Sequence, residues 1–445
     1  MWDLAAIRLN RSQPCHVIFS EKFVDVESKD RLTVTNPGDE KVIADNVHVA
    51  DQDDVDAAVD AATAAFKTGP WSKHTATQRA DILNKIAELI GTKYLEELSE
   101  IESVSMGQPI SVARAMNSYL PMTFKFAPAL AAGNTFIFKA SEKSPLGALV
   151  FGKIFKEAGV PSGVVNIING AGETGALLAS HMKISKISFT GSAFTGKKIQ
   201  AMAASSNLKK CTLELGGKSP CIVFEDVDIE NTLDVCSSQF LFNTTQVCIA
   251  TSRTFVHESI ADQFIEPIKQ RFSGAKAAIG SPSAPTTGIG PVVDKKQSDR
   301  VMSFIEAGKD EAELAVGGGR HGDKGFFIEP TIFLNPKDDA RIWREGVFGP
   351  VLSIRTFKTE EEAVKLANDT IFGLSSSLHT KNLSRALRVS RQIEAGTVAI
   401  NQSHGFAPQT PFGGYKQSGT GREFGKAGIL QYLQEKTILI KTPAK

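Results

Sequence analysis

The chain has 445 residues, too many for a single hydrophobic core, so two or three domains are expected. Its 50 basic and 49 acidic residues give a net charge of +1, and the basic residues are scattered, which argues against a nucleic-acid or membrane surface. No apolar run is long enough for a transmembrane helix and the start lacks a signal core, so we expect a cytoplasmic protein with a small-molecule partner.

The cysteines are odd in number and include no CxxC pair. They are Cys15, Cys211, Cys221, Cys236 and Cys248. This pattern indicates reduced thiols in a reducing compartment, and it argues against a disulfide framework or a zinc site.

The first part of the chain begins with a strand-like run at residues 16–26, followed by two amphipathic helices. The helices are predicted at 51–66 and 78–90, because apolar residues recur there every three or four positions. In the first helix these residues are Val55, Ala58, Val59, Ala62 and Phe66. Aspartates crowd its first turn, where they suit the helix dipole, and Gly69-Pro70 stops it.

From residue 135 onward, short β-branched runs alternate with helical stretches, which predicts a parallel sheet covered on both faces. The first series of strands is predicted at 135–139, 164–168, 186–191 and 211–215, and the second at 220–226, 252–258, 350–357, 375–380 and 396–401. A domain boundary is placed between the series, near Gly216-Gly217. The last run, TILIK at 437–441, is predicted as an isolated strand that pairs with another element or another subunit.

Two glycine-rich turns in the first series are candidates for phosphate binding. GAGETG at 170–175 fits G-x-G-x-x-G and lies between a strand and a helix, as a dinucleotide fingerprint requires, although a tight turn without a ligand fits equally. FTGSAFTG at 189–196 is a second such loop, in which Gly191 and Ser192 could offer donors to a phosphate. Together the two loops favour nucleotide binding.

Charged residues follow two of the predicted strands. Lys139 and Glu142, in KASE, lie at the carboxyl end of a strand and could hold ribose hydroxyls, unless this segment is a solvated loop. Glu214, in LELGGKSP, sits between apolar residues and beside two glycines. It is either a partly desolvated acid or base or a strand-end carboxylate facing water, and the glycines suggest close approach of the backbone to a ligand.

Cys248, in NTTQVCIATSR, is a candidate nucleophile. A reactive thiolate needs a lowered pKa, and the nearest histidine, His257, lies on a predicted strand and can face away. From these residues alone, an inert buried thiol remains the alternative. The aromatic residues in VFGP (347–350) and TPFGGYKQSGTGRE (410–423) either pack within turns or line an apolar substrate tunnel.

Taken together, these motifs resemble the aldehyde dehydrogenase superfamily. LELGGKSP and NTTQVC place Glu214 and Cys248 34 residues apart, with APALAAGN and FKASEKSPL upstream and FGP and PFGGYKQSG downstream. The resemblance runs from about residue 17 to the end of the chain. It implies an α/β fold with a Rossmann-type cofactor domain at 17–216, an α/β catalytic domain at 217–425 and a short oligomerisation segment at 426–445.

The resemblance also implies NAD(P)-dependent oxidation of an aldehyde to a carboxylic acid. Cys248 matches the nucleophile, which forms a thiohemiacetal and, after hydride transfer to the nicotinamide, a thioester; Glu214 matches the base that activates the deacylating water. The other matches are cofactor contacts at Lys139, Glu142, Gly170, Gly191, Ser192, Leu215 and Phe348, and a substrate contact at Phe412. A carboxylate near the adenosine ribose favours NAD over NADP. In the family, the segment that corresponds to GAGETG is not the main binding site for the cofactor phosphates.

The largest departure from the family lies before FKFAPALAAGN, near residues 116–117. Family members have several dozen further residues there, which supply a hairpin of the oligomerisation sheet, the first strand of the cofactor domain and a P-W-N motif. The asparagine of that motif donates to the oxyanion, and Asn117 is the only nearby candidate to replace it. Losing one oxyanion donor can lower turnover about 10²–10³-fold, with the backbone N–H of Cys248 remaining.

Two smaller departures lie near the expected active site. Gly346 occupies the position of a glutamate that grips the nicotinamide ribose, with Glu345 one place earlier, and Thr245 replaces a glycine. The departures leave two alternatives open: an impaired or inactive aldehyde-dehydrogenase-like protein, and a cysteine esterase that needs no cofactor. The missing hairpin further predicts a weakened homo-oligomer, with 437–441 left as an exposed edge.

Overall fold

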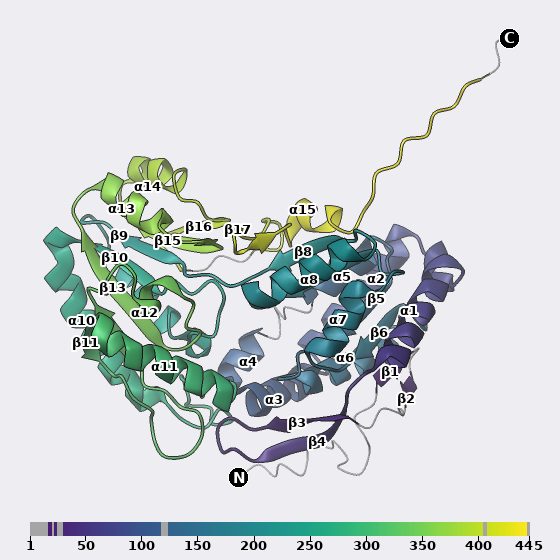
Figure 1. The fold of residues 1–445 in the computed structure, drawn as a ribbon, viewed down its shortest axis with the longest axis horizontal. Helices are drawn as coiled ribbons and strands as arrows, with labels where there is room; N and C mark the ends of the chain where they lie inside the picture. The colour runs from purple at the N-terminus through teal and green to yellow at the C-terminus, as the bar shows by residue number, and fades with distance from the viewer. Residues whose placement is uncertain (1–16, 20–21, 25–29, 117–122, 404–406, 443–445) are drawn as a thin grey trace.

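The computed structural model describes residues 17–19, 22–24, 30–116, 123–403 and 407–442. Figure 1 shows two lobes that meet along the middle of the molecule, one built mainly from the second half of the chain and one from the first half. Each lobe is a set of strands flanked by helices. The strands and helices of both predicted series are present, with ends that differ from the predicted ones by a few residues.

The lobe built from the second half contains one continuous sheet of seven strands. Their spatial order is β11 (Glu313–Val316), β12 (Thr331–Leu334), β13 (Val351–Phe357), β10 (Arg253–His257), β9 (Pro220–Val223), β15 (Ser375–His379) and β16 (Thr397–Ile400). All neighbours are parallel except β11, which runs antiparallel to β12. The covering helices are α9 (Ile229–Asp234), α10 (Ala261–Ala275), α11 (Lys295–Glu311), α12 (Arg341–Arg344), α13 (Glu360–Asn368) and α14 (Leu383–Ser390).

Successive residues of the central strand β9 enter different cores, as the alternation of side chains along a strand requires. Ile222 packs on one face with Phe255 and Phe304, whereas Cys221 packs on the other face with Phe264. Both faces are therefore fully covered, which explains why β9 reads as a continuous apolar run.

Most strands of the other lobe form two separate sheets, one of four strands and one of three. One has the order β2 (Lys22–Val24), β1 (Val17–Phe19), β6 (Val165–Ile168) and β5 (Phe136–Lys139), and the other has the order β18 (Gly419–Thr420), β8 (Lys210–Glu214) and β7 (Lys186–Thr190). Among the described residues, no strand pairs with the outer edge of β5 or of β7. A hairpin of β3 (Arg31–Thr35) and β4 (Val42–His48) and the pair β14 (Phe372–Gly373) and β17 (Tyr415–Lys416) complete the strands.

The helices of this lobe are α1 (Gln52–Lys67), α2 (Ala76–Gly91), α3 (Leu95–Met106), α4 (Ile110–Met116), α5 (Thr123–Ala131), α6 (Pro145–Glu157), α7 (Gly172–Ser180) and α8 (Ala193–Ser205). Asp51 caps α1 in a reciprocal pair of hydrogen bonds with Asp54, which fixes the start close to the predicted one. Four of the five predicted apolar positions of α1 are buried. The prediction for Phe66 was wrong, since its side chain is half exposed and Ala65 is buried instead.

Two helices connect the separate sheets. On α7, Leu178 packs with Ile137 of β5, while the next residue, Ala179, packs with Ile187 of β7. On α5, the Lys125 ammonium donates to the Ser188 hydroxyl of β7 at 3.2 Å. The open edges of β5 and β7 therefore belong to neighbouring sheets that share the helices α5 and α7.

The last part of the chain returns to this lobe. After β17, which pairs with β14 just before β15, the chain leaves the seven-stranded sheet: β18 pairs with β8, and α15 (Gly425–Leu430) follows it. The predicted strand at 437–441 forms no ladder with the described residues of this chain and projects from the body (Figure 1), so its pairing with another subunit stays a prediction. Its Leu439 side chain is 91% exposed, because a strand needs a partner to pair with its backbone.

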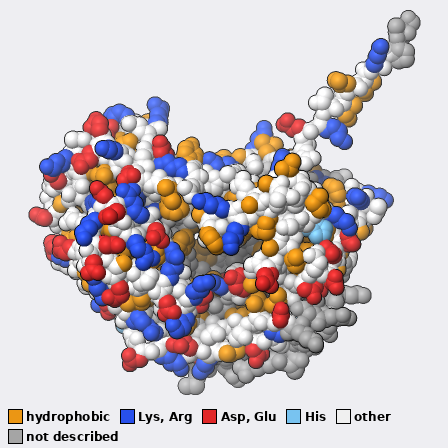
Figure 2. Space-filling view, in the orientation of Figure 1, with side chains coloured by type: hydrophobic (Ala, Val, Ile, Leu, Met, Phe, Trp, Pro, Cys, Tyr) orange, Lys and Arg blue, Asp and Glu red, His pale blue; other side chains and the backbone are white. Residues whose placement is uncertain are grey.

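The surface agrees with the balanced composition. Figure 2 shows acidic and basic side chains mixed over the face that is drawn, with a recess near its centre. No helix among the described residues is long and apolar enough to cross a membrane.

Candidate active site

Cys248 lies in a turn between helical segments and the strand β10. The segments before it are α9, one π-helical turn, η4 (Val235–Gln239), and a short 3-10 segment, η5 (Phe242–Thr245). The Cys248 side chain is partly accessible, whereas Ile249 after it is buried and anchors the turn. The nucleophile candidate is therefore placed at the amino-terminal edge of the continuous sheet.

Three consecutive residues before this turn have left-handed backbone conformations. The φ angles are 51° at Asn243, 54° at Thr244 and 58° at Thr245. This conformation costs β-branched residues about 1–2 kcal/mol each. Hydrogen bonds hold it in place, because the hydroxyls of Thr244 and Thr245 donate to the carbonyls of Gly290 and Phe240, each at 3.0 Å. Thr245 thus adopts the conformation for which a glycine was expected.

The two glycines after Glu214 bring the Cys248 turn against the chain. A Cβ atom on Gly217 would lie 2.9 Å from the carbonyl oxygen of Cys248, too close for any side chain. Gly216 faces the Phe348 ring, 3.6 Å from where its Cβ would be. These glycines were expected to let the backbone approach a ligand, and in the structure they let it approach Cys248 and Phe348, so the ligand contact stays a prediction.

Glu214 ends β8 as a buried carboxyl group, 4% exposed. Neither carboxyl oxygen has a hydrogen-bond partner among the described residues. Burial raises its pKa to about 9, and the negative charge of Glu423 adds to this shift while Lys125 and Arg422 oppose it. Of the two alternatives drawn from the sequence, the desolvated acid or base fits and a carboxylate facing water does not.

The pKa of the Cys248 thiol is raised to about 12, first by burial and second by the charge of Glu214. The backbone N–H groups of Cys248 and Ile249 lower it and offset part of this increase. The thiol and the carboxyl group therefore act on each other electrostatically, and both hold their protons at neutral pH in the absence of another charge.

A buried ion pair next to Glu214 was not singled out from the sequence. Lys125 of α5 and Glu423 form it, with 2.5 Å between Nζ and Oε1, although they are 298 positions apart. Gly413 also packs against the base, since a Cβ there would be 3.0 Å from Oε1 of Glu214. The sequence signal was a single lysine in the apolar run FKFAPAL.

A small cavity opens beside Cys248, with about 280 Å³ of empty space including open solvent. It is lined by Gly217, Thr245, Val247, Cys248, Ala250, Ser252, Gly346, Val347, Phe348, Gly349 and Val351. Phe348 has a φ of 56°, and the Gln297 side chain fixes this turn by donating to its carbonyl at 2.8 Å. Of the two predicted aromatic residues, Phe348 reaches the nucleophile.

Gly346, which occupies the position of the expected ribose-binding glutamate, lines this cavity, whereas the neighbouring Glu345 does not. Glu345 is half exposed and lies 3.4 Å from the Arg341 guanidinium, so its charge is directed to the surface. A Cβ on Gly346 would lie 3.1 Å from the Gly217 carbonyl and 3.2 Å from the Phe348 ring. This close packing leaves little room for a longer side chain at position 346.

The predicted adenosine-side residues lie at the carboxyl ends of β5 and β6. Lys139 Nζ donates to the carbonyls of Ala140 and Gly170, both at 2.6 Å, and burial lowers its pKa. Glu142 is exposed and close enough to raise the pKa of Lys139. Gly170 has a φ of 156°, and a Cβ there would lie 2.1 Å from the Thr174 hydroxyl, so the turn tolerates no side chain.

The second glycine turn lies across the lobe, between β7 and α8. Ser192 caps α8, because its hydroxyl accepts from the Thr195 backbone N–H at 3.2 Å, and its side chain remains exposed. The backbone N–H of Gly191 donates to the Glu214 carbonyl at 3.1 Å and is not free for a ligand. Leu215 is buried against Gly196 of α8. Leu215 could therefore reach a cofactor only through its backbone.

Of the two remaining predicted residues, Phe412 does not line the cavity. The Phe412 backbone pairs with that of Glu423, and its ring lies 6.2 Å from the Phe424 ring, so it stands on the Glu214 side of the site. Asn117 lies outside the described residues.

Comparison with known proteins gives a consistent picture. The model of the aldehyde dehydrogenase family matches residues 23–124 and 116–438. The chain is 42% identical to an aldehyde dehydrogenase of Davidiella tassiana over 479 aligned residues and 41% identical to one of Emericella nidulans, covering 96% of this chain in both cases and 96% and 95% of the relatives. Its fold matches a betaine aldehyde dehydrogenase of Staphylococcus aureus solved with NAD⁺, with a TM-score of 0.92, 33% identity, and 97% and 98% coverage.

The alignments also locate the departure. The Davidiella tassiana alignment is longer than this 445-residue chain, so the relative has residues without a counterpart here. The two parts of the family match meet at 116–124, where the sequence places the missing block. The length and strength of these matches show that the chain belongs to the aldehyde dehydrogenase family.

Proposed function

We propose that this chain catalyses NAD-dependent oxidation of an aldehyde to a carboxylic acid, with Cys248 as nucleophile and Glu214 as base. The observation that carries the proposal is that the partly accessible Cys248 lines a cavity while the charge of Glu214 acts on its thiol. A buried carboxyl group with no hydrogen-bond partner among the described residues, acting on an accessible thiol, is an arrangement that a structural core does not need.

A dinucleotide would contact this chain in three regions, at its adenosine, its phosphates and its nicotinamide, and the residues present fit the first two. At the adenosine end, Lys139 makes only two hydrogen bonds among the described residues, leaving a donor for a ribose hydroxyl, and Glu142 offers an exposed acceptor. In the middle, the 13-residue helix α8 presents its N-terminus with the exposed Ser192. At the nicotinamide end, Glu345 is paired with arginine instead. NAD, when bound there, supplies the hydride acceptor.

The chain's own residues then have distinct tasks. The thiolate of Cys248 attacks the aldehyde carbonyl, and the backbone N–H of Cys248 can donate to the oxygen that becomes negative. After oxidation, a thioester joins the acyl group to Sγ. Glu214, once deprotonated, removes a proton from the water that hydrolyses this thioester. The Lys125–Glu423 pair next to Glu214 sets the pKa at which this base becomes available.

We further propose that turnover is slow compared with that of relatives. The sheets end at β5 and β7 where a strand is missing, the ribose grip is absent, and the asparagine donor has no counterpart among the described residues. None of these features removes Cys248 or Glu214. The reduction is therefore expected in cofactor affinity and rate, and the chemistry itself should persist.

A second candidate is a cysteine esterase that needs no cofactor. The observation in its favour is that the continuous sheet carries the Cys248 turn, whereas the expected cofactor contacts are divided between two sheets. Ester hydrolysis uses the same thiolate and the same base and no hydride acceptor.

One experiment separates these functions. The purified chain is incubated with NAD and a panel of aliphatic and aromatic aldehydes while NADH absorbance is followed, and in parallel with an aryl ester with and without NAD. NADH formation that is lost in Cys248→Ala supports the dehydrogenase. Ester cleavage that depends on Cys248 without any NADH formation supports the esterase. NAD binding without either reaction identifies an inactive relative and contradicts both proposals.

The exposed C-terminal segment bears on assembly. Ile438, Leu439 and Ile440 are all more than 70% exposed, which is unusual for three consecutive apolar residues. We propose that this segment pairs with another copy of the chain, and that the assembly is weaker than in relatives because a partner hairpin is missing. Light scattering over a range of concentrations should then show a dissociating oligomer. A tetramer that persists on dilution would contradict the weakening.

A further inference from the structure

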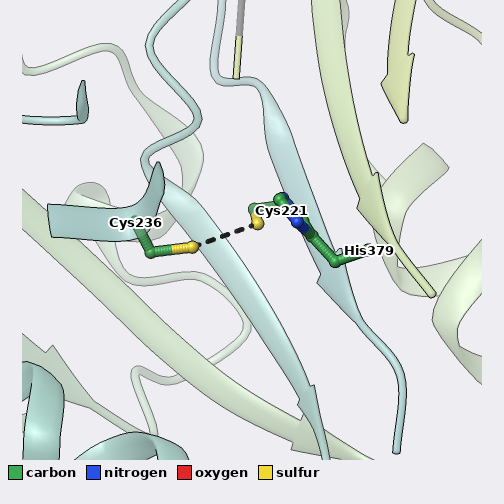
Figure 3. Close-up of side chains that lie close together, drawn as sticks. All are labelled: Cys221, Cys236 and His379. Carbon is green, nitrogen blue, oxygen red and sulfur yellow. Dashed lines mark hydrogen bonds between the residues drawn. The ribbon is translucent and has the colours of Figure 1, made fainter. Parts of the chain in front are cut away.

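A cluster of two cysteines and a histidine lies in the core of the continuous sheet. Cys221 is on the central strand β9, Cys236 is on the π-helical turn η4 that covers this face, and His379 ends the neighbouring strand β15. Figure 3 shows the three side chains converging from these separate elements. None of the three residues lines the cavity beside Cys248, so the cluster is separate from the proposed active site.

The three donor atoms are close enough to share one ion. Sγ of Cys221 and Sγ of Cys236 are 3.5 Å apart, and all three donor atoms lie within 4.8 Å of one another. Metal–sulfur bonds of about 2.3 Å in a tetrahedral site place two sulfurs about 3.8 Å apart. The observed spacing needs only a small adjustment to reach this geometry.

His379 is the least satisfied member of the cluster. Its side chain is fully buried, and neither ring nitrogen makes a hydrogen bond to a nitrogen or oxygen atom among the described residues. Its ring instead lies beside the two thiols, within 4.8 Å of both sulfurs. A buried imidazole with no nitrogen or oxygen partner is unusual in a protein core.

The strands beside Cys221 supply oxygen atoms on the same face. Ser377 of β15 and Thr254 of β10 are both in register with Cys221, and parallel neighbours in register point to the same side of a sheet. Both hydroxyls are buried and make no hydrogen bond to a nitrogen or oxygen atom among the described residues, and the Ser377 hydroxyl contacts the Cys221 thiol. The cluster therefore has two sulfurs, one nitrogen and a nearby hydroxyl that can complete four ligands.

We propose that Cys221, Cys236 and His379 bind a thiophilic divalent metal ion, with zinc as the expected occupant. Two thiolates and a neutral imidazole are ligands that zinc prefers. With a divalent ion the buried group is neutral overall, whereas a monovalent copper ion would leave a net negative charge in the core, which is costly. The two thiol protons are released to solvent on binding.

The site has a structural consequence for the proposed nucleophile. The turn η4 leads directly into the left-handed residues before Cys248, and the metal would fasten it to two strands of the sheet. The sequence argued against zinc because the cysteines are odd in number and include no CxxC pair. Only the sheet order places β15 beside β9 and brings them together.

Metal content tests the proposal on the intact protein. The chain is produced in medium containing zinc, purified without chelator, and measured by inductively coupled plasma mass spectrometry; one zinc ion per chain is expected. Protein produced with cobalt in place of zinc should show a sulfur-to-cobalt charge-transfer band and intense visible bands of a tetrahedral site. Metal-free wild-type protein with free thiols in the cluster, or a Cys221–Cys236 disulfide found by peptide mapping, would overturn the proposal.

Variants locate the ion. Cys236→Ser and His379→Phe should lose it or reduce its occupancy at least tenfold, while Cys211→Ser and Cys248→Ser, which alter cysteines outside the cluster, should retain it. Retention of full occupancy by Cys236→Ser and His379→Phe would place the metal elsewhere and contradict the assignment. If either cluster variant fails to fold, the cobalt spectrum of the wild-type protein still decides, because a site without thiolates lacks the charge-transfer band.

Discussion

In the lobe that carries Cys248, seven strands form one continuous sheet, whereas in the other lobe the strands form a four-stranded and a three-stranded sheet with open edges at β5 and β7. The expected cofactor contacts are divided by this interruption: Lys139 and Gly170 lie with one sheet, and Ser192 with the other. Their relative positions depend on the helices α5 and α7 that touch both sheets. Cofactor binding should therefore suffer more than the reactivity of Cys248.

The broadest expected effect comes from restoring the missing block, because it should change both cofactor affinity and turnover. Residues 117–122 would be replaced by the longer segment of the Davidiella tassiana relative that aligns between Met116 and Thr123. If this segment supplies a strand and an oxyanion donor, turnover with NAD and aldehyde should rise about 10²–10³-fold. Steady-state rates and the dissociation constant of NAD, measured by calorimetry, are the readouts.

A matched control separates the two contributions. The same insertion, with the asparagine of the P-W-N motif that the family resemblance implies changed to alanine, should recover NAD affinity while the turnover number stays low. A folded insertion variant in which both NAD affinity and turnover are unchanged would show that the interruption does not limit function.

The next prediction concerns Glu214, the proposed base. Glu214→Gln keeps the size of the side chain and removes the base, so hydrolysis of the thioester should fall about 10²–10⁴-fold. Rapid-mixing experiments should then show a burst of NADH, or of the ester's leaving group, as acyl-enzyme accumulates. An equal loss in the burst itself would assign Glu214 to the attack of Cys248 instead.

The pH dependence follows from the raised pKa of Glu214. A base must be deprotonated, so the rate of hydrolysis should rise about tenfold per pH unit and level off near pH 9. Stability has the opposite slope, because the folded state keeps a proton that the unfolded chain loses above the ordinary pKa of 4.5. The contribution of Glu214 to the unfolding free energy is therefore lost as pH rises toward 9, and Glu214→Gln should flatten both curves.

Glu423→Gln provides a second check on the same group. Removing this negative charge lowers the pKa of Glu214, since Glu423 raises it while Lys125, which remains, lowers it. The rise in rate should move to lower pH without loss of the plateau. A shift to higher pH would contradict the charge assignment.

The sequence predicted the parts of this molecule that depend on local patterns. Both series of strands and the helix at 51–66 depend on neighbouring residues, and the structure contains these elements. The roles expected of Glu214 and Cys248 depend on motif spacing and stay predictions. It also placed the missing block at 116–117, where the family match divides. The strained Thr245 was predicted from a single substituted glycine.

Features that depend on distant pairing were not predicted. The Lys125–Glu423 pair joins residues 298 positions apart, and the Cys221 cluster needs the order of strands β9 and β15. The apolar run at 437–441 was predicted as a strand, but its sequence pattern cannot show which element or subunit pairs with it. Local sequence also could not show that Phe412 stands with Glu423 rather than at the cavity.

Backbone strain at Thr245, in the lobe with the continuous sheet, should have a smaller effect, on the free energy of unfolding. Thr245→Gly relieves a left-handed β-branched residue, worth about 1–2 kcal/mol, but loses a buried hydrogen bond of about 1 kcal/mol and adds about 0.5–1 kcal/mol of unfolded-state entropy. The free energy of unfolding in urea should change by less than about 1 kcal/mol. Thr245→Val keeps the strain and loses the hydroxyl, so it should destabilise by about 1–3 kcal/mol. Equal effects of the two substitutions would mean that the strain is not stored at this residue.

The smallest expected effect tests a direct link between the lobes. Lys143, after β5, lies 2.7 Å from Asp294, which caps α11 on the other lobe. Both side chains are about one-third exposed, so Lys143→Met should lower the unfolding free energy by less than about 1 kcal/mol, and added salt should reduce the difference. Asp294→Asn keeps a capping oxygen and removes the charge, so it should match Lys143→Met. A larger loss for both variants would mean that the interrupted lobe depends on the continuous one for its stability, because an exposed ion pair alone cannot supply it.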